Sequence, residues 1–528
     1  MVKKIVLLSG HISSGKSKLS ENLQRYGAGV VKTKDLLIRS LRNTPSRGSL
    51  QGAGEKLDRT TRGEWVAEAL AEFVREKDER LVVVDSVRIK HQIDAVRRGF
   101  NVQVVHVHLT APKDVLESRF KLRDRKDISE ATFHDAMSNS TEKQVDKLKE
   151  FADICVDTSR CSENDVLIRV AAYLGLFDRD CEANVDVIIG GQYGSEGKGN
   201  IAAFLSPEYD YLIRVGGPNA GHKVYDPSFT FRHLPSGTQK NQKALIVLGP
   251  GTVINEEVLQ EEISGCQLEY NRLAIDPQAM LISPRDKRDE TNLKKEIGST
   301  GQGVGFATAR KIRHRSLKTK LAKDSKLLRP YIRPTYEILE RAYADCSRIL
   351  LEGTQGTALS IHHGHYPYVT SRDTTVAGCL AEAGIPPRRI RRILMVCRTY
   401  PIRVQSPTEG TSGPMKEPLS WEIIAKRSGI SLKELLSTET SSVSKKIRRV
   451  SEFDWELLRR ASSLNSPTDI ALTFADYLDK HNKSARRFDQ LTPDTIQFIE
   501  EIERVAAAPV SLISTRFHYR CIIDRRRW

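Results

Sequence analysis

The sequence predicts an α/β protein of two domains, each built on a largely parallel sheet. The chain of 528 residues is longer than one ordinary hydrophobic core supports. Short apolar strands alternate with helical segments, which favours parallel sheets covered by helices. A glycine-rich loop follows an apolar strand twice, and the polar stretch "GLFDRDCEANVD" separates the two halves. We therefore expect domains at residues 1–176 and 185–528.

Composition and charge exclude several classes of protein. With 39% apolar and 28% charged residues the chain has the balance of a folded protein, and no apolar run approaches the roughly 18 residues that cross a bilayer. Its eight cysteines include no pair at the spacing of a metal knuckle, so we expect reduced thiols in a cytoplasmic protein with no membrane contact. The net charge of +16 is gathered in short basic clusters, which suit nucleotides, nucleic acid and acidic metabolites alike.

The first half shows alternating strands and helices in order. Strands are expected at residues 3–10, 80–87, 102–109 and 152–159, because each of these segments contains a short apolar run rich in β-branched residues. A helix is expected over residues 15–26, directly after the first strand. This alternation predicts a parallel sheet with helices on its faces.

The loop "GHISSGKS" after the first strand matches the pattern G-x-x-x-x-G-K-[ST] of phosphate-binding loops. Gly10 and Gly15 let the backbone curl so that several N–H groups point at phosphate oxygens, and Lys16 supplies positive charge. The Ser17 hydroxyl is placed to reach Mg²⁺. This half therefore predicts the parallel sheet of a P-loop NTPase, and the alternative is a simple strand–helix turn.

Two later segments of this half suit phosphoryl transfer. Asp85 ends an apolar strand, where a carboxylate would hold magnesium through water or orient an acceptor, or would merely cap the strand. Arg123, together with Arg119 and Arg125, would close over transferring phosphates or form a solvated helix face. Residues 1–170 thus resemble the small P-loop nucleoside monophosphate kinases. The phosphate acceptor stays open.

The second half begins with the strand "VDVIIG" and the loop "GQYGSEGKG". The residues placed to wrap a polyphosphate at the following helix N-terminus are Gly194, Gly197, Lys198 and Gly199. After the next strand, "GGPNAGH" brings backbone close to a ligand, with Asn219 and His222 facing it. An imidazole there would donate to a phosphoryl group under transfer, although a lone histidine is more often structural.

Nine ordered motifs carry a resemblance over about 340 residues. Residues 185–528 resemble adenylosuccinate synthetase through "YGSEGKG", "GGPNAGH", "LPSG", "GSTGQGVG", "EGTQGT", "HGHYPYVTS", "KKIRR", "LTFADYLD" and "SLIST". That family uses the γ-phosphate of GTP to phosphorylate the 6-oxygen of IMP, and the amine of aspartate then displaces the phosphate. The resemblance implies a carbon–nitrogen ligase acting on a purine nucleoside monophosphate, L-aspartate and a nucleoside triphosphate, ATP or GTP, with Mg²⁺.

The resemblance also implies a role for each matching residue. Lys198 and the loop glycines would hold the triphosphate, His222 would be the general acid, and Gly221 would contact the metal. Gln355 would bond the 6-oxo edge of the purine, and Asp476 would read the base of the triphosphate. The residues that would seat the monophosphate are Asn219, Thr300 and Thr370. The residues that would hold the aspartate carboxylates are Ser441, Ser442, Lys446 and Arg448.

Ser195 departs from the family pattern at the catalytic position. The family has an aspartate there, which removes the purine ring proton and contributes to magnesium binding, and a serine hydroxyl does neither comparably well. The site is therefore inactive, or routes the proton through water or phosphate, or is rebuilt for a purine with a 2-amino group. Viral relatives of the family, the 2-aminodeoxyadenylosuccinate synthetases, carry the same change and act on dGMP with aspartate and ATP. The sequence also resembles their compact branch, so we expect dGMP as substrate and IMP as the second candidate.

Two other departures concern the partner subunit and the phosphoryl donor. His314 stands where the family has an arginine that reaches the partner's monophosphate, so a homodimer is expected from the resemblance alone. "SLISTRFHYR" lacks the Gly-Pro that helps the family read guanine, which leaves ATP and GTP open as donors.

Two alternatives from other classes stay open. One is a regulatory protein whose synthetase half binds nucleotides without turnover. The other is an N-terminal half that phosphorylates nucleic-acid ends. The net charge of +16 permits it, but it is disfavoured because the basic clusters already have uses in binding small anions.

Overall fold

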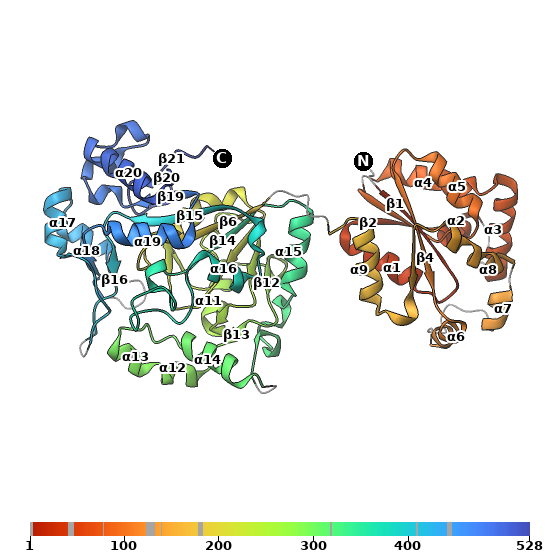
Figure 1. Ribbon diagram of the computed structural model, residues 1–528, viewed down its shortest axis with the longest axis horizontal. Helices are drawn as coiled ribbons and strands as arrows, with labels where there is room; N and C mark the ends of the chain where they lie inside the picture. The colour runs from red at the N-terminus through yellow and green to blue at the C-terminus, as the bar shows by residue number, and fades with distance from the viewer. Residues whose placement is uncertain are drawn as a thin grey trace. The chain divides into compact units, whose positions relative to one another are not determined.

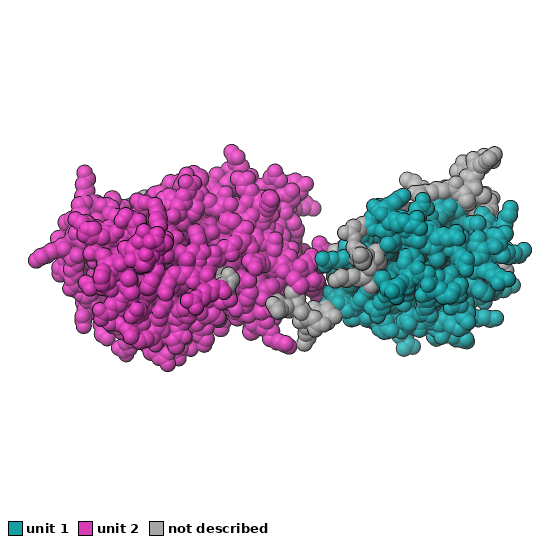
Figure 2. Space-filling model, turned by 90° about the horizontal axis from the view of Figure 1, so that it is seen from above, with its two compact units in different colours: residues 1–179 teal, residues 180–528 magenta. Residues whose placement is uncertain are grey.

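The computed structural model divides into two compact units, residues 1–179 and 180–528 (Figure 2). The structure describes residues 4–40, 47–77, 79–122, 132–138, 140–177, 183–316, 319–407, 410–440 and 446–527. Arg123, Ser441 and Ser442 lie outside the described residues. Each unit is described below by itself.

The first unit is a five-stranded parallel sheet in the order β2-β3-β1-β4-β5 (Figure 1). Its strands are β1 (Lys4–Gly10), β2 (Ala28–Lys32), β3 (Leu81–Asp85), β4 (Gln103–Thr110) and β5 (Ile154–Asp157). Four of these strands confirm the sequence prediction. The prediction missed β2, a short edge strand that begins with small residues and lacks a long apolar run.

Helices cover both faces of this sheet, as the alternating pattern predicts. They are α1 (Lys16–Leu23), α2 (Thr33–Ser40), α3 (Arg47–Thr61), α4 (Glu64–Glu76), α5 (Lys90–Gly99), α6 (Lys113–Lys121), α7 (Phe133–Ser138), α8 (Ser140–Val145) and α9 (Glu163–Tyr173). Val6 and Leu8 pack in one core with α1 and α9, whereas Ile5 and Leu7 pack in another with α4 and α5. Alternate residues of β1 thus pack in two hydrophobic cores, one on each face of the sheet.

The second unit contains a nine-stranded sheet in the order β12-β10-β7-β14-β6-β15-β19-β20-β21. Its strands are β6 (Val185–Gly190), β7 (Tyr211–Arg214), β10 (Leu245–Leu248), β12 (Leu273–Ile275), β14 (Ile349–Glu352), β15 (Ile390–Arg398), β19 (Asp469–Thr473), β20 (Val510–Ser514) and β21 (Ile522–Asp524). All neighbours are parallel except β20 and β21.

Eleven helices and several short strands among the described residues complete this unit. The helices are α10 (Lys198–Leu205), α11 (Glu256–Gly265), α12 (Pro284–Asp289), α13 (Thr291–Glu296), α14 (Val304–His314), α15 (Thr335–Ala344), α16 (Val376–Ala383), α17 (Trp421–Ser428), α18 (Leu432–Thr438), α19 (Trp455–Asn465) and α20 (Pro493–Ala506). The short strands are β8 (His222–Val224), β9 (Phe229–Phe231), β11 (Val253–Ile254), β13 (Met280–Leu281), β16 (Ile402–Arg403), β17 (Pro418–Leu419) and β18 (Arg449–Ser451).

The parallel sheet of the second unit gathers the predicted motifs at one edge. The loops after β7, β14, β6, β15 and β19 all leave from the carboxyl ends of neighbouring strands. These loops contain "GGPNAGH", "EGTQGT", "GQYGSEGKG", the segment around Arg403, and "FAD". Ligands of open α/β sheets bind at this edge, so the topology explains why motifs far apart in sequence meet.

Two sequence expectations concern cysteines and membranes. Six of the described cysteines are free thiols, but Cys346 is disulfide-bonded, so the expectation of reduced thiols is wrong at that position. Within the described ranges, no helix combines the length and the apolar character that crossing a bilayer requires.

Candidate active sites

The glycine-rich loop after β6 folds around the carboxylate of Glu196, a residue of the same loop. Gly194 and Gly197 have positive φ angles of 88° and 93°, which glycine adopts without strain. Glu196 is fully buried and accepts a hydrogen bond from the Gly194 amide at 2.7 Å, while Lys198 donates to it at 2.5 Å. Both side chains of this ion pair are almost without exposure. Lys198 therefore lies under the loop and is held by Glu196.

The same loop places His222 by close packing. A Cβ on Gly199 would lie 2.9 Å from the Cβ of His222, so the start of α10 approaches β8 closely only because residue 199 is glycine. The Nδ1 atom of His222 lies 2.5 Å from Oε1 of Glu352, the last residue of β14. Glu352 also accepts hydrogen bonds from the amide and hydroxyl of Ser236 at 2.7 and 2.5 Å. Glu352 thus fixes the orientation of the imidazole.

Burial and neighbouring charges determine the protonation states of His222 and Glu352. Burial and the nearby Arg214 lower the pKa of His222 to about 4. Burial alone would raise the pKa of Glu352, but the hydrogen bond from His222 and the charge of Arg214 hold it below its ordinary value. The pair is therefore a neutral imidazole that donates from Nδ1 to an ionised carboxylate. Nε2 is then the ring nitrogen left to face a ligand.

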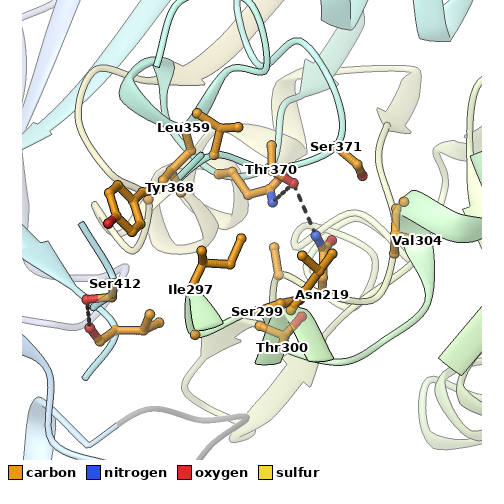
Figure 3. Close-up of a pocket in the computed structure, with 18 of the residues that line it drawn as sticks. Asn219, Ile297, Ser299, Thr300, Val304, Leu359, Tyr368, Thr370, Ser371 and Ser412 are labelled. Carbon is orange, nitrogen blue, oxygen red and sulfur yellow. Dashed lines mark hydrogen bonds between the residues drawn. The ribbon is translucent and has the colours of Figure 1, made fainter. Parts of the chain in front are cut away.

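A cavity of about 420 Å³ opens above these groups (Figure 3). The sequence-predicted residues that line it are Gly194, Ser195, Asn219, Gly221, His222, Thr300, Gln355, Thr370 and Arg448. Gly197, Lys198, Gly199 and Lys446 are not in its lining, and Lys446 is exposed. Its volume lies in the range that holds a small ligand such as a nucleotide.

One wall of this cavity offers polar atoms without protein partners. Thr370 accepts hydrogen bonds from the side-chain amides of Gln355 at 2.6 Å and of Asn219 at 3.5 Å, and Figure 3 shows Asn219 pointing toward Thr370. Asn219 Oδ1 and Gln355 Oε1 are buried and have no hydrogen-bond partner among the described residues. Because buried acceptors without partners are costly, these two oxygens are set to accept from a ligand.

Ser195 lies exposed at this cavity in a strained backbone position. Its φ angle is 55°, in the left-handed region, and its carbonyl oxygen accepts a hydrogen bond from Arg398 at 3.3 Å. Ser195 therefore belongs to a short turn whose backbone is held by Arg398, and it lines the same cavity as Asn219 and Gln355. A longer side chain with a carboxylate would extend further into that space.

Two lining residues of this cavity were not identified by the sequence analysis. Glu290 accepts hydrogen bonds from the Ser299 hydroxyl and the Gly303 amide, so it holds the loop "GSTGQG" that carries Thr300. Arg403, in β16, lines the cavity although it is only 5% exposed, and its guanidinium lies 4.5 Å from the Tyr193 ring. Neither residue belongs to a motif with a recognisable phosphate pattern, so no local signal marked them.

The residues expected to bind aspartate are only partly gathered. Arg448 lines the cavity and donates to Glu439 at 3.4 Å. Glu439 is fully buried and also binds Arg398 at 2.7 Å. Although burial alone would raise it, the charges of Arg398 and Arg448 hold the pKa of Glu439 below its ordinary value. The buried, ionised carboxylate of Glu439 thus holds Arg448 beside the cavity.

A second cavity of about 570 Å³ is lined by Asp476. Arg398, which donates to the Ser195 carbonyl, lies over the Phe474 ring of this cavity. Phe474 and Phe517 stack within it with ring centroids 5.5 Å apart. The structure thus separates Asp476 from Ser195, because each lines a different cavity.

The P-loop of the first unit has the predicted strand–loop–helix context. Gly10 and Gly15 have φ angles of 136° and 98°, and a Cβ on Gly10 would meet the Leu109 carbonyl oxygen at 2.2 Å. Lys16 donates to the carbonyl oxygens of Gly10 and His11 at 2.8 Å. Lys16 and Ser17 line a cavity of about 400 Å³. Ser13 and Ser14 hydroxyls are buried there without a partner among the described residues.

Asp85 lies beside this loop because β3 pairs with β1. Its register partner is Leu8, two residues before Gly10, and its Oδ2 lies 3.5 Å from the Ser20 hydroxyl on α1. Nearby, His11 lies 3.2 Å from Glu142 and 2.7 Å from Asp146. The hydrogen bond with Glu142 is the main cause that raises the pKa of His11. The sequence analysis did not identify this buried pair.

Comparisons with known proteins agree with the motifs. Residues 187–327 and 317–484 match the adenylosuccinate synthetase family. The chain belongs to the adenylosuccinate synthetase family. Its synthetase unit is fused to a P-loop kinase-like domain, since residues 5–151 match an AAA domain family.

Relatives and solved structures extend this result. The chain is 36% identical over 351 residues to adenylosuccinate synthetase of Pyrococcus horikoshii, a match that covers 64% of this chain and 98% of that protein. The enzyme of Methanocaldococcus jannaschii is also 36% identical over 351 residues, covering 64% of this chain and 96% of that protein. The fully ligated adenylosuccinate synthetase of Plasmodium falciparum shares the fold, with a TM-score of 0.56 and 22% identity over 65% of this chain and 100% of that one.

A viral structure is also similar to this chain. It is the cyanophage S-2L succinoaminodeoxyadenylate synthetase (PurZ) bound to dGMP and to dATP as an energy donor. The TM-score is 0.55 with 27% identity, and the match covers 65% of this chain and 96% of the viral protein. The synthetase unit is therefore a ligase of this family.

Proposed function

We propose that the synthetase unit joins L-aspartate to the 6-position of dGMP, with IMP as the second substrate. The observation that carries this proposal is the exposed hydroxyl of Ser195 in the cavity lined by Asn219 and Gln355. A carboxylate facing a guanine edge would accept from both the ring N1–H and the 2-amino group, and would hold an unreactive ground state. A hydroxyl removes that double acceptor and leaves room for the amino group.

The comparison with the viral protein supports dGMP, and the archaeal relatives support IMP. The cyanophage protein binds dGMP and is 27% identical to this chain. The archaeal adenylosuccinate synthetases are 36% identical. Overall identity therefore favours the archaeal group, whereas the serine at position 195 favours the viral one. Since identity averages over the whole unit and Ser195 lies in the cavity, we give the residue more weight.

The chemistry follows two displacement steps. The ring N1 proton passes to water as the 6-oxygen of the purine attacks the γ-phosphorus of the donor, the bond to the β-phosphate oxygen breaks, and the nucleoside diphosphate leaves. The aspartate amine then attacks C6, loses a proton to water and expels the phosphate, so one N–C bond replaces one C–O bond. His222, oriented by Glu352, protonates the phosphoryl oxygen that becomes the leaving group, because an anionic phosphoryl group favours the charged imidazole. Gln355 bonds the purine edge and Arg448 binds a carboxylate of aspartate.

Gly221 and Ser195 would hold a magnesium ion, since both line the cavity and carry oxygen atoms. Mg²⁺ prefers such oxygen ligands and uses few protein groups when phosphates are bound. When bound there, the ion would neutralise charge on the transferred phosphoryl group. Lys198 would donate hydrogen bonds to the phosphates after leaving its ion pair with Glu196.

Product analysis tests the ligase proposal directly. The full chain is incubated with dGMP or IMP, L-aspartate, Mg²⁺ and ATP or GTP, and succinylated nucleotides are identified by mass spectrometry. We expect the adduct of dGMP to form at least about tenfold faster than that of IMP. Turnover of IMP alone would exclude dGMP. Binding of both nucleotides without any adduct would identify a regulatory protein instead.

For the first unit we propose a nucleotide kinase that uses its P-loop. Lys16 and Ser17 line the cavity at the loop, and Asp85 lies beside it on β3, so one hydroxyl and one carboxylate are available for Mg²⁺. We propose no nucleic-acid acceptor. A Lys16→Ala variant should lose phosphoryl transfer by roughly a hundredfold or more, since this ammonium stabilises the transferring phosphates.

The same variant separates the two activities. Because Lys16 belongs to the first compact unit, we expect Lys16→Ala to leave succinyl-adduct formation within about twofold of the wild-type rate. A parallel loss of both activities would show that the units act on one shared site. The matched Lys77→Ala variant, at an exposed lysine after α4 that does not line this cavity, should change neither activity.

We also propose that the synthetase unit forms a homodimer. Ile312 on α14 is 66% exposed, and Arg313 and His314 follow it. Exposed apolar groups flanked by charges are common at subunit interfaces. Light scattering of the full chain would give twice the chain mass, and a Ile312→Asp variant should shift it toward a monomer.

A further inference from the structure

The cavity at the P-loop of the first unit is also lined by a cysteine. Cys161 stands directly before Ser162, the N-cap of α9, and it lines the cavity of about 400 Å³ together with Lys16 and Ser17. The helices α1 and α9 pack side by side in one hydrophobic core (Figure 1). Their packing brings the thiol-bearing residue and the phosphate loop to the same cavity.

Two buried hydroxyls indicate that this cavity binds a ligand. Ser13 is 5% exposed and Ser14 is fully buried, and both line the cavity. Neither hydroxyl has a hydrogen-bond partner among the described residues. Because buried polar groups without partners are costly, a bound ligand is expected to satisfy them. Cys161 therefore lines a ligand-binding cavity, not an ordinary stretch of surface.

The surroundings of the Cys161 sulfur differ from those of Cys155, six residues earlier. Both residues are free, partly exposed cysteines. The thiol of Cys155 donates to the Lys149 carbonyl oxygen at 3.7 Å, and burial raises its pKa. The sulfur of Cys161 instead accepts a hydrogen bond from the Arg169 guanidinium at 3.3 Å. Since reactive cysteines lie beside cations in partly exposed positions, we expect Cys161 to react faster than Cys155.

The charges around Cys161 favour an anionic reagent. The charged side chains that line the cavity are Lys16, Lys18, Arg119, Glu21 and Glu163. Arg169 adds a further positive charge at the sulfur. Positive groups thus outnumber negative ones, and such a cavity raises the local concentration of small anions.

We propose that Cys161 forms a reversible mixed disulfide with an anionic low-molecular-weight disulfide, glutathione disulfide being the probe, and that this modification closes the P-loop cavity to nucleotides. The Cys161 thiolate attacks one sulfur of the reagent, a new S–S bond to Cys161 forms, and the S–S bond of the reagent breaks. One glutathione stays on the protein. The other leaves as a thiolate, which takes up the proton that Cys161 lost. A thiol reductant reverses the exchange.

The volume of the cavity explains why the modification excludes a nucleotide. About 400 Å³ is in the range that holds one small ligand, so an attached tripeptide and a nucleotide would compete for the same space. This inference rests on the proposed function, in which the cavity holds the phosphates of a nucleoside triphosphate.

Peptide mass spectrometry of the full chain tests the site. Trypsin cleaves after Arg160, so Cys155 and Cys161 fall in separate peptides. With glutathione disulfide, the mixed disulfide should form at Cys161 at least about tenfold faster than at Cys155. Cystamine, a cationic disulfide, should react at Cys161 more slowly than glutathione disulfide. Equal rates at the two cysteines, or a faster reaction with cystamine, would overturn the proposal.

Nucleotide binding tests whether the modification closes the cavity. MgADP at about ten times its Kd should slow the labelling of Cys161 about tenfold, and the same MgADP concentration should protect less in Lys16→Ala. Conversely, chain treated with glutathione disulfide should lose one calorimetric MgADP site, and dithiothreitol should restore it. Cys161→Ser should keep that site after the same treatment, whereas the matched Cys155→Ser variant should lose it as the wild type does. Loss of the site in treated Cys161→Ser would overturn the proposal.

The kinase proposal and this inference fail in different ways. If MgADP protects Cys161 but glutathione disulfide shows no preference for it over Cys155, only the inference fails. If Cys161 reacts preferentially but MgADP leaves its rate unchanged, the cavity binds no nucleotide, so the proposed kinase fails and the closing of a nucleotide site fails with it.

Discussion

A Ser195→Asp variant is expected to lose most of its activity on dGMP and to gain activity on IMP. The new carboxylate would accept the ring proton of IMP and act as the base, which is worth roughly 100-fold or more in rate. With dGMP the same carboxylate would accept from N1–H and from the 2-amino group and stabilise the unreactive ground state, so kcat should fall by about 100-fold. The measurement is kcat and KM for each monophosphate with saturating aspartate and donor.

The backbone at position 195 makes aspartate a fair test and supplies its control. The φ angle of 55° lies in the left-handed region, which aspartate and asparagine tolerate better than most residues. Ser195→Asn has the size of the aspartate side chain without its charge, so it should lose dGMP activity moderately and gain none on IMP. If Ser195→Asp keeps the preference for dGMP, the 2-amino group is not what Ser195 accommodates.

Sequence periodicity predicts the sheets well because parallel strands are buried on both faces. Such strands read as continuous apolar runs, as "IVLL" in β1 and "VDVII" in β6 do. The edge strand β2 was not predicted because "AGVVK" is short and most of its residues are small or charged. Loop motifs are predictable for a different reason, since glycines at positive φ and phosphate-binding side chains are local requirements.

The supporting carboxylates could not be predicted from the sequence. Glu352 and Glu439 are both buried, and each acts through a partner that lies elsewhere in the chain. Glu352 stands 130 residues from His222, and only the order of β7, β14 and β6 in the sheet brings their segments together. Long-range pairing of this kind leaves no periodic or local signal in a single sequence. The same holds for the separation of Ser195 and Asp476 into two cavities.

The His222–Glu352 pair leads to the second large effect. A His222→Asn variant should lower kcat for adduct formation by roughly 10²- to 10⁴-fold, with a small change in KM, because an amide cannot deliver the proton that the leaving phosphate requires. Thermal unfolding should change little, since the asparagine amide can still donate to the buried Glu352. Loss of binding in place of kcat would contradict a role as general acid.

Glu352→Gln distinguishes positioning from chemistry. The carboxylate raises the pKa of His222 through its hydrogen bond and charge. Its loss should lower that pKa, so the alkaline decline of kcat, where His222 loses its proton, should begin at lower pH, with kcat reduced about tenfold. Ser236→Ala is the matched control, because it removes a hydrogen bond to Glu352 at 2.5 Å but keeps the charge. If both variants shift the pH profile equally, packing around Glu352, and not its charge, governs the imidazole.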